Sequence, residues 1–103
     1  MMERWVDVAG VADLDECLAV QVGELEIGLF RSKSGIHAVS NSCTHVGAPL
    51  TDGYITGDDV LCPWHGAKFC LKTGASHGPP AMSGLRVFVT KISGDRILVQ
   101  VNS

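Results

Sequence analysis

The sequence predicts an all-β domain of many short antiparallel strands, closed as a small barrel or sandwich. Three observations lead to this fold class. The chain of 103 residues holds 12 glycines and 4 prolines, which points to many turns. Apolar side chains alternate with the period of a strand, as at Leu25, Ile27 and Leu29. Short turn signals, such as Ser32-Lys33-Ser34-Gly35, separate the apolar segments.

The expected strands follow one another with little chain between them. Residues 4–8 alternate weakly and predict a first strand, and residues 9–16 read as a polar connection or a helical turn. Gly23 stands where a hairpin turn would fall. Residues 75–83 contain Gly78-Pro79-Pro80 and fit neither a helix nor the inside of a sheet. Further strands are expected at 17–22, 24–30, 36–40, 54–56, 60–62, 68–71, 85–91 and 97–101, the last two forming a hairpin.

Two short loops hold residues typical of a metal centre. The first begins Cys43-Thr44-His45 and the second reads Cys62-Pro63-Trp64-His65, with sixteen residues between His45 and Cys62. Structural zinc sites usually pair cysteines on one hairpin with histidines elsewhere. A cysteine and a histidine this close together fit a bimetallic centre, in which neighbouring side chains reach different metal ions. A [2Fe-2S] cluster with two cysteines on one iron and two histidines on the other is such a centre.

These loops resemble those of the Rieske family, whose pattern is C-x-H, a long spacer and then C-x-x-H. The match reads C-T-H-V-G-A-P-L and C-P-W-H-G-A-K-F, and the likeness extends over nearly the whole chain. The resemblance implies one Rieske-type [2Fe-2S] cluster, with Cys43 and Cys62 on one iron and His45 and His65 on the other. It also implies a single domain, 1–103, in which a cluster-binding part of about 41–80 is inserted in a β base and carries the two loops at its tip.

Departures from the respiratory, high-potential Rieske proteins bear on the reduction potential. Those proteins carry an extra cysteine in each loop, at the positions of Ala48 and Trp64, so this chain cannot form their disulfide. They also carry serine and tyrosine hydroxyls at the positions of Ala67 and Phe69. Hydrogen bonds to the cluster sulfurs stabilise the reduced state, so we expect a potential at the low end of the Rieske range of roughly −150 to +300 mV. The potential should depend little on pH near neutrality.

With its expected low potential and short chain, the protein resembles the ferredoxin component of bacterial aromatic-ring dioxygenase systems. The resemblance implies a one-electron carrier, not an enzyme, between an NAD(P)H-dependent flavoprotein reductase and a terminal Rieske non-haem iron oxygenase. The imidazole edges of His45 and His65 would be the exit for the electron. Two alternatives stay open: a small subunit of an assimilatory nitrite reductase, and a non-redox zinc module. A detached oxygenase domain is the third, but its mononuclear iron site does not fit within this length.

Composition limits the partners and the location. The length suits one domain with one modest core. A formal net charge of −3 argues against a nucleic-acid partner. No apolar run approaches the ~18 to 20 residues of a membrane span, and the first residues lack the pattern of a signal peptide. We therefore expect a cytoplasmic protein without a membrane partner, and nothing demands an oligomer.

Five residues outside the ligand set need an interpretation. Cys17 and Cys70 are expected to be reduced thiols, Cys17 packed as a small apolar residue and Cys70 partly exposed. His37 reads as an ordinary strand histidine. Trp64 would shield the cluster from water, or contact a partner. His77 precedes a proline-containing loop, which in the Rieske family covers the cluster, so it is either a surface histidine or a residue that influences the cluster or docking.

Overall fold

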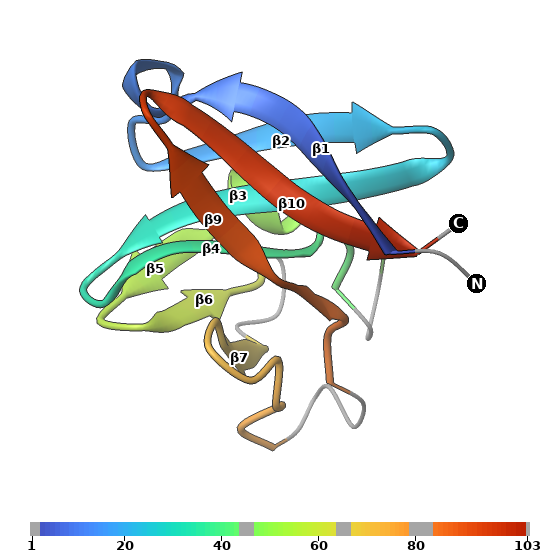
Figure 1. Ribbon diagram of the computed structural model, residues 1–103. Coiled ribbons are helices and arrows are strands. Elements are labelled where there is room, and N and C mark those ends of the chain that lie inside the picture. The colour runs from blue at the N-terminus through green and yellow to red at the C-terminus, as the bar shows by residue number, and fades with distance from the viewer. Residues whose placement is uncertain (1–2, 44–46, 64–66, 79–83, 103) are drawn as a thin grey trace.

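Three antiparallel sheets make up the protein in a computed structural model, which describes residues 3–43, 47–63, 67–78 and 84–102 (Figure 1). The all-β prediction is confirmed. The strands of the first sheet lie in the order β1 (Glu3–Gly10), β10 (Arg96–Asn102) and β9 (Thr90–Ser93). Those of the second sheet lie in the order β2 (Cys17–Val22), β3 (Leu25–Ser32), β4 (Gly35–Ser40) and β8 (Val87–Phe88). The third sheet consists of β5 (Tyr54–Thr56), β6 (Asp59–Leu61) and β7 (Lys68–Cys70), in that order. Single-turn 3-10 helices lie at Val11–Asp13 (η1) and Leu50–Asp52 (η2). Within the described ranges, neither helix has the length or apolar character that crossing a bilayer requires.

The hairpin between β2 and β3 forms where the sequence predicts it. Val22 pairs with Leu25, so that only Gly23 and Glu24 make the turn. Gly23 has a φ of 60°, in the left-handed region that glycine adopts without a steric cost. The other predicted strands, apart from 85–91, begin and end within two residues of the observed ones. Local turn chemistry and alternation are therefore sufficient to locate most of the strands.

The predicted single strand over 85–91 is wrong, because the chain changes sheets at Val89. On one side of Val89, β8 pairs with β4, and on the other side β9 pairs with β10. Leu85 and Phe88 are both buried, although they lie three positions apart, a spacing that puts residues of one regular strand on opposite faces. Each contacts a different cluster of buried residues. The segment is extended throughout, but its two halves take their hydrogen bonds from different neighbours.

Two clusters of buried side chains hold the sheets together, which corrects the expectation of one core. The first, called here the base core, lies between the first and second sheets; the second, the loop core, lies between the second sheet and the third. Strand β3 contributes to both, because successive side chains point to opposite faces: Ile27 and Leu29 to the base core, and Phe30 to the loop core. In Figure 1 the third sheet lies below β3 and β4, away from β1.

The members of the two cores are as follows. The base core contains Ala9, Leu14, Ile27, Leu29, Ala38, Phe88, Ile97, Val99 and Val101. The loop core contains Phe30, Val39, Cys43, Ala48, Leu50, Val60, Cys62, Ala67, Phe69, Leu71 and Leu85. Both cysteines of the predicted ligand set are therefore in the loop core.

Gly53 lets two backbones approach each other next to the second loop. A Cβ atom at this position would overlap the carbonyl oxygen of Leu61 and lie 3.2 Å from that of Leu50. We expect Gly53→Ala to lower the free energy of unfolding by about 3 kcal/mol, the upper end of overpacking costs, measured by urea denaturation. Gly57→Ala is the control: its Cβ meets open space, and its φ of 62° costs an alanine only about 1 kcal/mol. Equal losses in the two variants would contradict the steric explanation.

Asp58 ties the third sheet to the hairpin between β3 and β4. Its Oδ1 atom accepts hydrogen bonds from the Ser32 hydroxyl and the Ser34 N–H, both at 2.8 Å. Lys72 Nζ lies 3.6 Å from Oδ2. The backbone adds a bond across the same contact, from Lys33 N–H to the Gly57 carbonyl at 3.1 Å, while the Leu71 N–H donates to the Asp58 carbonyl at 2.8 Å on the third-sheet side. Side-chain and backbone contacts thus hold the third sheet against the second at this point.

The same contacts predict a loss of stability in acid. Hydrogen bonds from the side chains of Ser34 and Ser32, and from the Ser34 N–H, hold the pKa of Asp58 well below its usual range. A depressed pKa contributes stability that is fully present above the unfolded pKa of about 3.9 and is lost as pH falls through the folded pKa. Asp58→Asn should therefore lower the Tm near neutral pH and show a smaller further loss in acid.

Thermal unfolding followed by circular dichroism from about pH 7 to about pH 2 tests this expectation. Asp15→Asn, an exposed aspartate outside the contact, should keep the wild-type profile. The stabilities of the wild type and of Asp58→Asn should converge toward the acid end. Curves that stay parallel over the whole range would show that the Asp58 contacts do not contribute to acid unfolding.

Candidate metal centre

The first predicted ligand loop begins at a buried cysteine just after β4. Cys43 is 1% exposed. Its N–H donates to the Ala48 carbonyl at 2.8 Å, and its own carbonyl accepts from the Gly47 N–H at 2.7 Å. Gly47 has a φ of 74°, which suits a tight return of the chain. The backbone N–H and the backbone carbonyl of Cys43 are thus both hydrogen-bonded to the far end of the loop.

The second loop is closed in the same way. Cys62 follows β6 directly, is 2% exposed, and donates its N–H to the Ala67 carbonyl at 2.7 Å. In both loops the cysteine amide therefore bonds to the carbonyl five residues further along the chain. Strand β7 begins immediately after Ala67. Each cysteine is held by its backbone at the start of a short loop, and the two loops are alike.

The loop core brings the two cysteines into one buried cluster. Ala48 and Ala67, which close the loops, are 2% and 0% exposed, and Phe69 is 0% exposed. Two thiolates buried without a cation would be costly to desolvate, whereas iron bound by two cysteines satisfies them. Thiolates are also the soft ligands that iron-sulfur clusters prefer. The sulfur half of the predicted ligand set therefore fits a [2Fe-2S] cluster.

The other half of the predicted set lies outside the described residues. His45 and His65 belong to the segments 44–46 and 64–66, as does Trp64. Their assignment to the second iron, and the shielding role of Trp64, remain predictions from the sequence.

The remaining two cysteines have different surroundings. Cys17, at the start of β2, donates its S–H to the Thr51 carbonyl at 3.1 Å, so it does more than fill space. Burial, followed by the negative charges of Glu16 and Asp52, raises the pKa of Cys17 and keeps the donor proton in place. At the end of β7, hydrogen bonds from the side chain and then the backbone N–H of Thr73 lower the pKa of Cys70. Cys70 is partly exposed, as expected.

The two described histidines both make polar contacts. His37 lies within β4, as predicted, with Nε2 2.8 Å from the Ser34 hydroxyl, and burial lowers its pKa. His77 lies next to β7, and its N–H donates to the Lys68 carbonyl at 2.9 Å. Its Nε2 atom is 2.9 Å from Asp59 Oδ1 on β6. His77 is therefore a surface partner of the third sheet, and an influence on the cluster remains a prediction.

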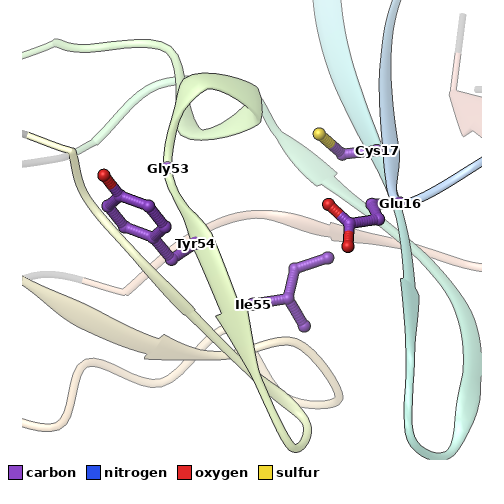
Figure 2. Close-up of a pocket in the computed structure, with 5 residues that line it drawn as sticks. All are labelled: Glu16, Cys17, Gly53, Tyr54 and Ile55. Atoms are coloured by element: carbon purple, nitrogen blue, oxygen red, sulfur yellow. The ribbon is translucent and has the colours of Figure 1, made fainter.

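A small pocket lies at the seam between the second and third sheets. It has a volume of about 170 Å³. Figure 2 shows the Glu16 carboxylate and the Ile55 side chain facing each other, whereas the Tyr54 ring points to the other side of β5. This volume is below the roughly 300 to 1,000 Å³ of typical small-molecule sites. Its lining is Glu16, Cys17, Gly53, Tyr54 and Ile55, without Cys43 or Cys62.

Asn41, a polar residue just before the first loop, is not among the site residues predicted from the sequence. Asn41 is 4% exposed and bonds to both Glu26 and Thr51. It stands between Ser40 and Ser42, in a stretch that looks like any polar loop. The sequence carries no signal that would separate a buried, fully bonded asparagine from an exposed one here.

Comparison with known proteins agrees with the geometry of the loops. The family model for the Rieske [2Fe-2S] domain matches residues 4–89. The ferredoxin component of the naphthalene 1,2-dioxygenase system of Pseudomonas aeruginosa is 30% identical, over 99% of this chain and 100% of its own. The solved ferredoxin of carbazole 1,9a-dioxygenase from Nocardioides aromaticivorans has a TM-score of 0.85 at 29% identity, over 92% of this chain and 95% of its own.

A second similar structure comes from a complex of two proteins. It is a chain in the solved complex of reduced oxygenase and oxidised ferredoxin in carbazole 1,9a-dioxygenase, with a TM-score of 0.84 at 28% identity, over 92% of this chain and 91% of that chain. The family model covers most of the sequence, including both predicted ligand loops. The chain is therefore a member of the Rieske [2Fe-2S] domain family.

Proposed function

We propose that this protein is a low-potential one-electron carrier that takes electrons from an NAD(P)H-dependent flavoprotein reductase and passes them to a terminal Rieske non-haem iron oxygenase. One observation carries the proposal: two buried cysteines begin two alike loops, in a chain similar over its whole length to a dioxygenase ferredoxin. When bound, the [2Fe-2S] cluster supplies reversible uptake of one electron. In this role the protein transfers electrons as a component of a multicomponent system and is not itself the catalyst.

Cys43 and Cys62 would hold one iron of the cluster, and His45 and His65 the other. The described residues support the sulfur half of this assignment, because both cysteines lie in the loop core. Their burial keeps water away from the sulfur ligands. Their backbone hydrogen bonds hold the loops in one geometry, which limits rearrangement between the two oxidation states. A rigid, dry site of this kind suits a carrier that has to exchange electrons repeatedly.

The side chains around the cysteines favour a low potential. Ala67 and Phe69 are fully buried in the loop core and carry no hydroxyl. Neither can donate a hydrogen bond from its side chain to a cluster sulfur. Because such bonds stabilise the more negative, reduced cluster, a site without them holds its added electron less tightly.

We further propose that residues 1–103 form a single Rieske domain, in which about 41–80 are the cluster-binding part and the rest is the β base. The third sheet supports this division, because among the described residues none of its strands pairs with a strand of the other two sheets. The loop core, which contains both cysteines, is also distinct from the base core. The Asp58 contacts would join the two parts.

The proposed partners and state follow from the same role. The solved complex of an oxygenase with a ferredoxin supports an oxygenase as the acceptor. A flavoprotein reductase suits the donor side, because a flavin can take two electrons from a nicotinamide and release them one at a time. We also propose a cytoplasmic monomer, which sedimentation and cell fractionation would test.

Anaerobic electron transfer with purified components tests the function. The cluster-loaded protein is mixed with NADH and a ferredoxin reductase of a naphthalene dioxygenase system, and bleaching of its visible absorption reports reduction. Once a limiting amount of NADH has been used up, adding the oxidised terminal oxygenase of that system should reoxidise the protein, seen as recovery of its absorption after the spectral change of the oxygenase itself is subtracted. If the reductase fails to reduce the protein, or the oxygenase fails to reoxidise it, the result would argue against a carrier role between these two enzymes. Co-purification with a large sirohaem subunit would favour the nitrite reductase alternative instead.

A further inference from the structure

A buried asparagine joins the two ends of the first ligand loop. Asn41 lies two residues before Cys43. Among the described residues, it is the one polar or charged residue whose side chain is buried. Its Nδ2 atom donates to Thr51 Oγ1 at 3.0 Å and to Glu26 Oε1 at 3.1 Å. Its Oδ1 atom accepts from the Thr51 N–H at 2.9 Å. Both hydrogens of the amide and its oxygen are therefore used.

Thr51, the partner of Asn41, is held from several directions. It lies in η2, immediately after Leu50 at the end of the first loop. Its N–H and hydroxyl bond to Asn41, and its carbonyl accepts the Cys17 S–H from β2. The Asn41 N–H in turn donates to the Glu26 carbonyl on β3 at 3.0 Å. The residues on both sides of the loop are thus bonded to each other and to the β base.

Strand β3 leaves room for this arrangement at Gly28. A Cβ atom there would lie 2.7 Å from the Phe30 ring and 3.2 Å from Asn41 Oδ1. Its φ is outside the left-handed region, so glycine is needed here because a side chain would not fit, and not because of the backbone conformation. Its neighbours Ile27 and Leu29 are completely buried. A mid-strand glycine beside the amide is consistent with a site built around Asn41.

We propose that the Asn41–Thr51 pair is a positioning device for the cluster: it closes the Cys43 loop and fixes it to strands β2 and β3, and so sets how firmly the cluster is held and at what potential. The proposal rests on the ligand role of Cys43 in the proposed function. Hydrogen bonds in a buried environment are costly to break, because each group left unpaired has lost its water. The pair therefore resists any opening of the loop that would move Cys43 away from the metal.

Three variants and a matched control test the device. Thr51→Val removes the hydroxyl that accepts from Asn41, Thr51→Ser keeps it, and Asn41→Leu removes the whole amide. Ser32→Ala is the control, because it removes a part-buried hydrogen bond from the same β3 at the Asp58 contact, away from the loop. The readouts are the rate at which the folded, loaded protein loses iron to an iron(II) chelator, its visible circular dichroism, its reduction potential and its Tm.

Thr51→Val should lose iron roughly tenfold faster than the wild type, with a changed visible spectrum and a displaced potential. Asn41→Leu should lose it faster still, and Thr51→Ser should restore the wild-type rate. Ser32→Ala should lower the Tm without changing the spectrum or the potential. If Thr51→Val loses iron no faster than Ser32→Ala, or keeps the wild-type potential and spectrum, the positioning role is refuted. If Asn41→Leu fails to fold, the comparison of Thr51→Val with Thr51→Ser still tests the positioning role.

These readouts separate the proposal from the function on which it rests. None of them uses a reductase or an oxygenase, so the wrong choice of redox partner would leave the expected differences intact. A cluster that persists in Cys43→Ser would instead remove the premise, whatever the behaviour of the Thr51 variants.

Discussion

Replacing Cys43 or Cys62 by serine is expected to abolish assembly of the [2Fe-2S] cluster. Serine matches the size of cysteine and fits the same buried positions, which are 1% and 2% exposed, but it lacks the thiolate that binds iron. One iron would then keep a single cysteine ligand and would no longer connect the two loops. The loss should be complete, which makes this the largest effect expected of any single substitution described above.

Visible absorption, together with assays for iron, acid-labile sulfide and zinc on the same sample, measures the effect. Cys70→Ser makes the same chemical change at the partly exposed end of β7, outside the loop core, and should retain the full cluster content. A full cluster in Cys43→Ser or Cys62→Ser would show that the ligand assignment is wrong. Stoichiometric zinc without sulfide in the wild type would favour the zinc-module alternative.

Restoring the two absent hydroxyls is expected to raise the reduction potential. Phe69→Tyr and Ala67→Ser would place O–H donors in the loop core beside Cys43 and Cys62. A net hydrogen bond to a charged group is worth ~1.5 to 3 kcal/mol, which corresponds to roughly 60 to 130 mV for one electron. Each variant should shift the potential upward by an amount in this range, because the added bond favours the reduced cluster.

Protein-film voltammetry across pH measures the shift. Phe88→Tyr is the matched control, because it adds the same hydroxyl to a buried phenylalanine of the base core and should leave the potential unchanged. The wild-type wave is expected near the low end of roughly −150 to +300 mV and flat around neutral pH. Equal potentials in Phe69→Tyr and Phe88→Tyr, or a high wild-type potential, would show that the side chains at Ala67 and Phe69 do not set it.

Several features of the fold could be predicted because they depend on neighbouring residues alone. The β2–β3 turn follows from Gly23, the residue type that accepts a φ of 60° at no cost. Alternation predicts Ile27 and Leu29 on one buried face of β3. The spacing of cysteine and histidine singled out Cys43 and Cys62, and the structure places both in one buried cluster. Each of these inferences needs only local geometry and the chemistry of the side chains.

Other features could be decided only by the tertiary structure, because they depend on residues far apart in the chain. Extended segments look alike whichever sheet they join, so the change of sheets at Val89 leaves no trace in the pattern of residues 85–91. The burial of Asn41 depends on Thr51 and Glu26, ten and fifteen residues away. The depressed pKa of Asp58 likewise depends on Ser34 and Ser32, which are 24 and 26 residues away. The sequence by itself determined the kind of metal centre, and long-range packing decided what holds its loops in place.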